Sequence, residues 1–216
     1  SAALRADVDA VVRDAPFEDW LEHGWAVRIA LEHRWMHAET LAYLLHRLPH
    51  DKKQGREALH DVARPAPQNT LLAIPPGRAR LGRPTTERHF GWDNEYGPHE
   101  VDVPAFRIQR YPVSNADFLR FIEADGYTRR ALWTAEDWAW KESQRVTHPA
   151  FWARVEGRWV WKAMFENVPL PPSWPAWVSL AEARAYARWA GRTLPTEAQW
   201  HRAAYDAGRA YPWGDE

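Results

Sequence analysis

Hydrophobic spacing divides this chain into two parts that need different folds. Over residues 17–48, apolar side chains recur at three- and four-residue steps, and Pro49 ends the run. Residues three or four apart share one face of a helix, so this spacing predicts a single long helix. A shorter run with the same spacing predicts a helix over residues 2–13, before Pro16. The first part of the chain is therefore expected to be helical.

Short alternating runs and turn residues replace the helical spacing from about residue 73. A short strand with turns is expected near residues 73–82, and a half-buried strand over residues 100–109 with Pro104 at a bulge or an edge. Another strand is expected over residues 158–162, after a turn at Gly157. Long irregular connections are expected between these elements.

Capping sequences mark the starts of three helices in this second part. Ser114, Ser179 and Thr196 are each followed three residues later by an Asp, Glu or Gln that can complete a cap. They predict helices over residues 115–125, 180–190 and 197–206, the first two ending at Gly126 and Gly191. The sequence thus predicts an α+β protein with a helical domain over residues 1–50, a linker over 51–72 and a loop-rich domain over 73–216.

Charge and composition exclude several classes of function. The 28 basic and 29 acidic residues are interspersed, which argues against nucleic acid and anionic membranes as partners. No apolar run approaches 18 residues, so no membrane span is predicted. The chain has no cysteine, which excludes disulfides and thiol nucleophiles within it and is consistent with a cytoplasmic protein.

Tryptophan is strongly over-represented, with 15 residues that lie mostly after position 90. The simpler interpretation is a core built from large rings in a domain with little regular structure. The alternative is an aromatic cage for a cationic ligand.

Two histidines four residues apart, His33 and His37, give the most specific chemical signal. One helical turn places both rings on the same face, about 6 Å apart, where a single divalent metal can contact both. On its own the pattern is more typical of a surface or a core than of a metal site. Neutral imidazoles would suit iron, zinc, copper or nickel, and a third ligand must come from another helix.

Glu39 follows the histidine pair but points elsewhere. At 100° per residue it lies about 240° around the helix from His33 and about 200° from His37. It is therefore expected to support the ligands from outside the coordination sphere, or to have a structural role, and not to bind the metal directly. The residue after His33 is Arg34, so the His-Glu-x-x-His pattern of zinc proteases is absent.

The stretch HRWMHAETL at residues 33–41 resembles the iron-binding helix of the non-haem iron sulfoxide synthases of ergothioneine biosynthesis, a His-x3-His-x-Glu motif in a DinB-like four-helix bundle. The second part resembles the formylglycine-generating-enzyme, or sulfatase-modifying-factor, domain that is fused to that bundle. Its matching stretches are FGWDNE (90–95), HEVDV (99–103), YPVSN (111–115), WVSLAEA (177–183), WAGRTLPTEAQW (189–200) and YPWG (211–214).

This resemblance implies part of a DinB-like bundle followed by a loop-rich, C-type-lectin-like domain. It implies an Fe(II) cofactor with His33 and His37 as two of three facial ligands, although nothing before residue 30 matches the helix that carries the third. Met36 stands where some relatives have a Gln that contacts the substrate imidazole, which makes it a candidate substrate-binding residue. The conserved-looking stretches 90–95 and 194–200 are expected to fix loops and cap helices, not to catalyse.

The implied reaction joins a histidine betaine of the hercynine type to a cysteine-type thiol, with O2 as oxidant, forming a C–S bond and a sulfoxide. Catalytic residues are expected beyond Glu216, because the chain reads as a piece of a longer enzyme. The absence of cysteine distinguishes it from true formylglycine-generating enzymes, which use a cysteine pair. Two alternatives remain open: a DinB-type metal-dependent thiol S-transferase, and a non-catalytic scaffold that keeps the fold.

Overall fold

The computed structural model of this chain describes residues 2–14, 24–55, 62–87 and 90–205, and the following description is confined to them. The chain forms two compact units. A smaller unit comprises Ser1–Arg47 and Leu81–His99, and a larger unit comprises Leu48–Arg80 and Glu100–Glu216. The YPWG motif at residues 211–214 lies outside the described residues.

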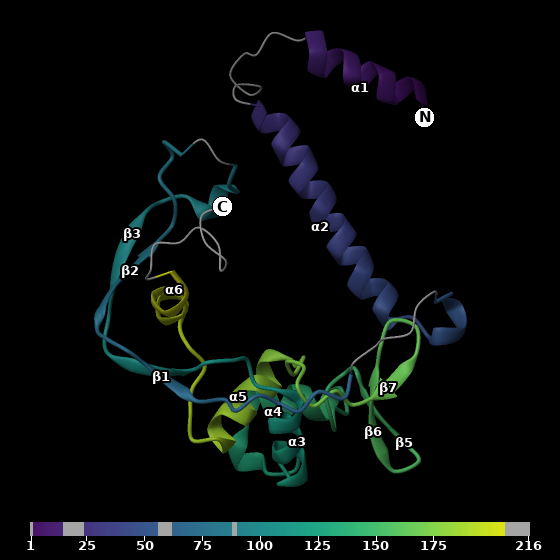
Figure 1. Cartoon of the computed structure of the whole chain (residues 1–216), viewed down its shortest axis with the longest axis vertical. Coiled ribbons are helices and arrows are strands. Elements are labelled where there is room, and N and C mark those ends of the chain that lie inside the picture. The colour runs from purple at the N-terminus through teal and green to yellow at the C-terminus, as the bar shows by residue number, and fades with distance from the viewer. Residues whose placement is uncertain (1, 15–23, 56–61, 88–89, 206–216) are drawn as a thin grey trace. The chain divides into compact units, whose positions relative to one another are not determined.

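Two helices account for most of the smaller unit. Helix α1 spans Ala2–Asp14, as the sequence predicts, and helix α2 spans Trp25–Arg47, which confirms the second part of the predicted helix over 17–48 (Figure 1). Gly24, at a φ of +71°, precedes α2, and the predicted helical residues 17–23 lie outside the described residues. Helix α2 ends two residues before Pro49, whose ring cannot continue a helix.

The prediction of one strand over residues 100–109 is wrong, because Pro104 divides it into two strands. Strand β3 (His99–Val103) pairs with β2 (Gly77–Leu81), while β4 (Phe106–Gln109) pairs antiparallel with β1 (Leu71–Ile74). Strand β1 therefore begins inside the predicted linker. The stretch near residues 73–82, where one short strand with turns was expected, contains the end of β1 and all of β2. Proline has no N–H for a strand ladder, which explains why pairing changes partner there.

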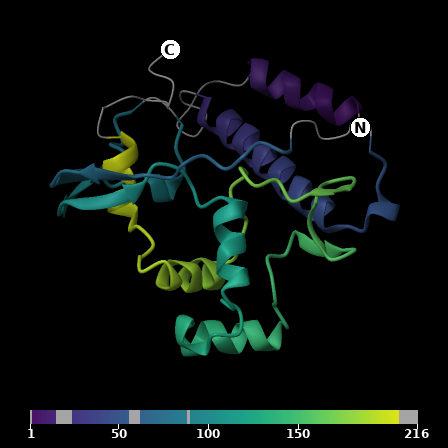
Figure 2. The same cartoon turned by 60° about the horizontal axis from the view of Figure 1, so that its bottom comes forward.

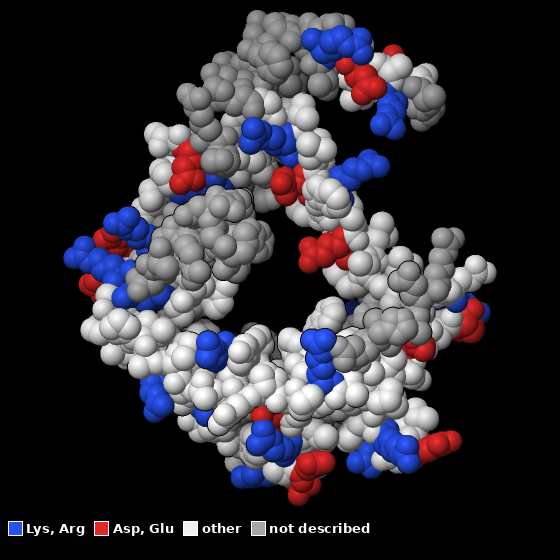
Figure 3. All heavy atoms as spheres, in the orientation of Figure 1, with Lys and Arg blue, Asp and Glu red and all other residues white. Residues whose placement is uncertain are grey.

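Charged side chains cross between β2 and β3. Arg78 and Arg80 both contact Glu100, at 3.0 and 3.2 Å, and Arg78 also contacts Asp102 at 3.3 Å. The hydrogen bond from Arg78 is the main cause that lowers the pKa of Glu100. Basic and acidic side chains are likewise interspersed on the face drawn in Figure 3, in agreement with the balanced composition.

A three-stranded antiparallel sheet lies further along the larger unit. Strand β6 (Arg158–Lys162) confirms the sequence prediction and pairs with β5 (Trp152–Val155) and β7 (Asn167–Pro169) (Figure 1). Glu156 and Gly157 make the turn between β5 and β6 with φ values of +50° and +79°. Neither β5 nor β7 was predicted from the sequence.

All three predicted capping sequences open helices. Helix α3 spans Asn115–Glu123, α5 spans Leu180–Trp189 and α6 spans Glu197–Tyr205. Helix α4 (Ala135–Ser143), capped by Thr134, falls in a stretch expected to be irregular. Helix α5 contacts both α3 and α4, and the turned view shows these helices together (Figure 2).

Aromatic rings fill the core of the larger unit, which confirms the simpler interpretation of the tryptophan content. Phe118, Phe121 and Trp152 are fully buried, and Trp133 and Trp161 nearly so. Most ring pairs meet edge-on or tilted, as aromatic quadrupoles favour. Large rings thus supply buried area where strands are short and helices have only two or three turns.

One buried polar pair lies beside these rings. The Tyr127 hydroxyl donates a hydrogen bond to the Glu182 carboxylate, and Glu182 also accepts hydrogen bonds from Ser179, the N-cap residue of α5. Burial, with a smaller contribution from the Glu182 charge, raises the pKa of Tyr127 well above its ordinary value of 10. The pair ties the loop after α3 to the first turn of α5.

The end of α3 differs in detail from the sequence prediction. Asp125, and not Gly126, takes the left-handed backbone conformation, with a φ of +58°. Gly126 is required for a different reason, since a Cβ atom at that position would overlap the ring of Phe121. Its carbonyl also accepts a 2.9 Å hydrogen bond from the indole of Trp133.

Gly126→Ala is therefore expected to lower the free energy of unfolding by about 3 kcal/mol, because the fully buried Phe121 ring cannot move aside cheaply. Gly191→Ala is the matched control. It has a φ of +64° but no neighbouring atom within 4 Å, so only the left-handed backbone should cost stability, about 1 kcal/mol. Urea denaturation measures both, and an equal or smaller loss at Gly126 would contradict the proposed overlap.

Tyr127→Phe is expected to destabilise the fold by about 1–3 kcal/mol at neutral pH, because the buried Glu182 carboxylate loses a donor. In the wild type, Tyr127 ionises near pH 10 only after unfolding, since its pKa is raised in the folded state. Its contribution to stability is thus complete below about pH 10 and declines above it. The variant should show a shallower alkaline decline in urea unfolding.

Tyr186→Phe is the matched control at neutral pH. Its ring stacks on Phe118, and no hydrogen bond of its hydroxyl is found among the described residues, so the substitution should change stability little at pH 7. Equal destabilisation by the two variants would mean that the Tyr127–Glu182 hydrogen bond contributes nothing specific.

Candidate functional site

Helix α2 brings the two predicted metal ligands together. The ring centroids of His33 and His37 lie 4.5 Å apart with an angle of 41° between the ring planes. Both residues are exposed, and the helix is continuous from Trp25 to Arg47. The rings therefore neither diverge nor lie buried against hydrocarbon, and the local geometry agrees with the one-turn spacing read from the sequence.

The donor set of this pair fits a borderline transition metal. Two imidazole nitrogens on one face suit Fe(II) as well as zinc, copper or nickel. Within the described ranges, no group of three His, Cys, Asp or Glu side chains gathers in a way that could hold a metal ion. The described residues thus bring two imidazoles together, and no third candidate donor gathers with them.

Glu39 and Met36 are both exposed on the same helix. Because α2 is regular, their angular positions follow the helical spacing, and Glu39 lies on the far side of the helix from the two rings. No hydrogen bond between Glu39 and either imidazole is found in the described part of the chain. Their predicted roles, as a supporting carboxylate and a substrate contact, remain predictions.

The face of α2 that carries the histidines also carries aliphatic residues, together with Thr40. Ile29, His33, His37 and Leu41 follow one another at four-residue steps, and Leu44 continues the row. Ile29, Leu41 and Leu44 are 44%, 57% and 49% exposed, and α2 has no buried residue among those described. The two imidazoles therefore belong to a stripe that, in a helical bundle, would face the interior.

The FGWDNE stretch holds a loop in place, as expected. Arg83 donates a 2.7 Å hydrogen bond to the carbonyl of Phe90 and pairs with Glu87. The carboxylate of Glu95 accepts a hydrogen bond from the backbone N–H of Trp92 at 3.2 Å. These contacts confirm a structural role for this stretch in the smaller unit.

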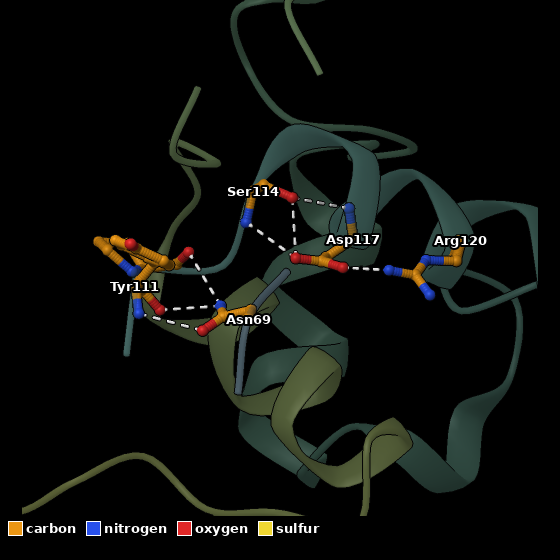
Figure 4. Close-up of polar contacts among 6 residues, drawn as sticks. Asn69, Tyr111, Ser114, Asp117 and Arg120 are labelled. Carbon is orange, nitrogen blue, oxygen red and sulfur yellow. Dashed lines mark hydrogen bonds and ion pairs between the residues drawn. The ribbon is translucent and has the colours of Figure 1, made fainter. Parts of the chain in front are cut away.

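The YPVSN stretch also has a structural role. The Asn69 side chain donates to the carbonyl of Tyr111 at 2.9 Å and accepts from its N–H at 3.0 Å (Figure 4). Ser114 then caps α3, its hydroxyl accepting from the N–H of Asp117 and donating to that carboxylate at 2.8 Å. Fully buried Asn115 donates to the carbonyl of Pro171. Sequence reasoning did not identify Asn69, which lies far from this stretch in the chain.

A groove of about 620 Å³ lies beside the segment that Asn69 holds. One wall is formed by residues 106–113, and the other by the end of α5, residues 192–195 and the start of α6. Tyr111 and Trp200 are 43% and 49% exposed there. The volume falls in the range of ligand sites. The groove could not be predicted from the sequence, because its walls are distant in the chain.

Comparison with known proteins identifies a domain family. The sequence profile described as "Sulfatase-modifying factor enzyme 1-like domain" matches residues 57–216. The match begins within the predicted linker over 51–72, where strand β1 also begins.

Proteins named hercynine oxygenase are similar to most of this chain. That of Mycolicibacterium thermoresistibile is 36% identical over 198 residues, which cover 88% of this chain and 44% of the relative. That of Mycolicibacterium smegmatis is 32% identical over 225 residues, covering 99% of this chain and 50% of the relative. A formylglycine-generating enzyme of Thermomonospora curvata is 35% identical over 179 residues, covering 72% of this chain and 57% of the relative.

The chain spans about half the length of the hercynine oxygenases that it matches. Among the described residues, no helix is both long and apolar enough to cross a bilayer.

Proposed function

Because the chain belongs to the sulfatase-modifying factor enzyme 1-like domain family, we propose that it is part of an oxygenase of the ergothioneine pathway. The observation that carries this proposal is the extent of the alignments. Alignments with two hercynine oxygenases cover 88% and 99% of the chain, whereas those with a third hercynine oxygenase and with the formylglycine-generating enzyme cover 63% and 72%. An alignment over 99% of the chain includes helix α2 and its histidine pair, so the similarity extends well beyond the family domain.

The proposed architecture places residues 1–50 in a DinB-like bundle ahead of the family domain. Its support is the stripe of α2 on which the exposed aliphatic side chains of Ile29 and Leu41 flank His33 and His37. Other bundle helices covering that stripe would enclose the imidazoles in a site of low water content.

The proposed cofactor is Fe(II), held by the neutral imidazoles of His33 and His37 together with a third ligand. When bound, the ion would supply oxygen activation and a binding site for the thiol and imidazole substrates. The chain's own contribution is to fix two donor side chains one helical turn apart on the same face of α2. Met36, the residue before His37, is the proposed contact to the imidazole substrate.

The proposed reaction joins the imidazole carbon of a histidine betaine to a cysteine-type thiol. One C–H bond and one S–H bond break, a C–S bond and an S=O bond form, and O2 is reduced by four electrons to the sulfoxide oxygen and one water. No further reductant is needed. A metal-dependent thiol S-transferase would need no oxygen, so the stoichiometry of oxygen distinguishes the two enzyme candidates.

Metal binding is the direct test of the ligand pair. The chain, titrated with Fe(II) without oxygen in a calorimeter, is expected to bind weakly, because it offers two donors. His33→Ala and His37→Ala should each weaken binding by at least about tenfold while helix content by circular dichroism is unchanged. His46→Ala, on the same helix, is the control and should retain binding. Equal binding by all three variants would refute the assignment.

Activity should be tested in a polypeptide of the relatives' full length that includes this chain. Supplied with Fe(II), hercynine and cysteine, it is expected to consume one O2 per sulfoxide formed, as measured with an oxygen electrode and mass spectrometry. His33→Ala should abolish both signals. Product formation without oxygen would favour the S-transferase. A folded protein that binds no iron and forms no product would favour the scaffold.

A further inference from the structure

The first residue of helix α2 packs against two rings of the segment that connects β2 to β3. The ring centroid of Trp25 lies 5.4 Å from that of Phe90 and 6.4 Å from that of Tyr96, with interplanar angles of 52° and 54°. Tilted contacts at these distances are favourable between aromatic rings. All three residues belong to the smaller unit. Phe90 and Tyr96 thus form an aromatic socket for Trp25.

Burial along α2 is concentrated at this contact. Residues 25–27 are partly buried, whereas residues 28–39, which include both histidines, are all exposed. Gly24 precedes Trp25 with a φ of +71°, a left-handed conformation that does not continue a right-handed helix. The longest covered run of α2 is therefore the end that carries Trp25.

Contacts inside its own segment hold the aromatic socket in place. The guanidinium of Arg83 donates a 2.7 Å hydrogen bond to the carbonyl of Phe90, and the backbone N–H of Arg83 donates to the carbonyl of Glu95 at 2.8 Å, next to Tyr96. Gly91 leaves room for this arrangement, because a Cβ atom there would lie 3.0 Å from the Arg83 guanidinium and 3.2 Å from the Tyr96 hydroxyl. The two rings therefore offer a defined support for a third ring.

The aromatic socket joins two parts of the chain that differ in origin. The family profile matches residues 57–216, which include Phe90 and Tyr96 but not helix α2. The contact with Trp25 is made by residues of this chain and needs no free surface. The socket therefore links the helix of the histidine pair to a segment of the family domain.

A regular helix carries the effect of this contact to the histidines. His33 and His37 follow Trp25 by about 12 and 18 Å along the helix axis. Helix α2 is continuous over this length, so a tilt about its first turn moves both imidazoles together. When reacting groups must be held in position, a displacement of about 1 Å can lower the rate about a hundredfold.

We infer that the aromatic socket, by holding Trp25, sets the position of His33 and His37 relative to the family domain. Trp25, Phe90 and Tyr96 are then positioning residues that touch neither metal nor substrate. The inference rests on the proposed function, because the proposed metal site is what they would position. Loss of the socket should lower turnover while the unchanged ligands still bind iron.

The position of α2 can be measured in the metal-free chain, because a chain without cysteine can be labelled specifically at two introduced ones. Nitroxide labels at Ala42→Cys and Asn94→Cys, both exposed positions, report the distance between α2 and the socket segment by pulsed electron paramagnetic resonance. Ala42 lies about 26 Å along the helix from Trp25, so a tilt is amplified there. We expect a narrow distance distribution that Trp25→Ala broadens by about twofold or more.

Trp35→Ala is the matched control, since Trp35 is a tryptophan of the same helix that is 71% exposed, and it should keep the narrow distribution. Trp25→Phe keeps a ring in the socket and should also stay narrow. Phe90→Leu removes the contact from the other side and should broaden the distribution as Trp25→Ala does. Circular dichroism checks that α2 remains helical in each variant.

Three results of the distance measurement would overturn the inference. The first is a broad distribution before Trp25 is changed. The second is equal widths for Trp25→Ala and Trp35→Ala. The third is broadening by Trp25→Ala but not by Phe90→Leu, because the effect would then belong to the helix and not to the socket.

In a polypeptide of the relatives' full length, Trp25→Ala is expected to lower sulfoxide turnover by about tenfold or more at unchanged iron content, and Trp25→Phe to restore most of it. Joint loss of iron and turnover would indicate a purely structural role and overturn the inference. Unchanged turnover would also overturn it while leaving the proposed function intact. An inactive wild type would refute the proposed function, and the label distances would still decide whether the socket positions α2.

Discussion

Edge-on contact between large aromatic rings is the interaction on which the larger unit depends. Its strands have three to five residues and its longest helix ten, so regular backbone pairing can stabilise only a small part of it. Phe118, Phe121 and Trp152 fill the interior instead, and neighbouring elements adapt to them. Gly126 illustrates the constraint, because its missing side chain is what lets the Phe121 ring lie against the loop after α3. Rings of this size can pack closely in only a few ways. The irregular segments around them are therefore held in one conformation.

Polar side chains complement the rings by fixing the irregular segments between them. Ser114, Ser179 and Thr196 each start a helix through a reciprocal cap, and Asn69 holds a neighbouring loop. Each cap satisfies backbone N–H groups that would otherwise lack partners at a helix start. Because Glu182 is both a cap residue and the acceptor for Tyr127, helix initiation and core packing are coupled at one carboxylate.

Local signals explain what could be predicted from the sequence. Helix caps, the turn at Gly157 and the spacing of His33 and His37 each depend on residues no more than four apart. The structure contains the predicted caps and turn, and the two histidine rings lie close together. Helix α4 and strands β5 and β7 lack a clear period and were not predicted. The prediction of a single strand over 100–109 was wrong. The alternation of apolar and polar residues continues through Pro104, whereas the partner strand changes there from β2 to β1. The groove joins segments distant in the chain, so no local pattern could reveal it.

The apolar stripe of α2 connects the metal proposal to the architecture. A helix that exposes Ile29, Leu41 and Leu44 gains stability when another surface covers them, because isolated helices are marginal in water. Two imidazoles in the same row hold a metal ion weakly until a third donor joins them. In the proposed bundle, a covering helix that carries a ligand would bury Ile29, Leu41 and Leu44 and complete the metal site on the same face of α2. The proposed bundle and the proposed metal site therefore require the same arrangement of helices around α2.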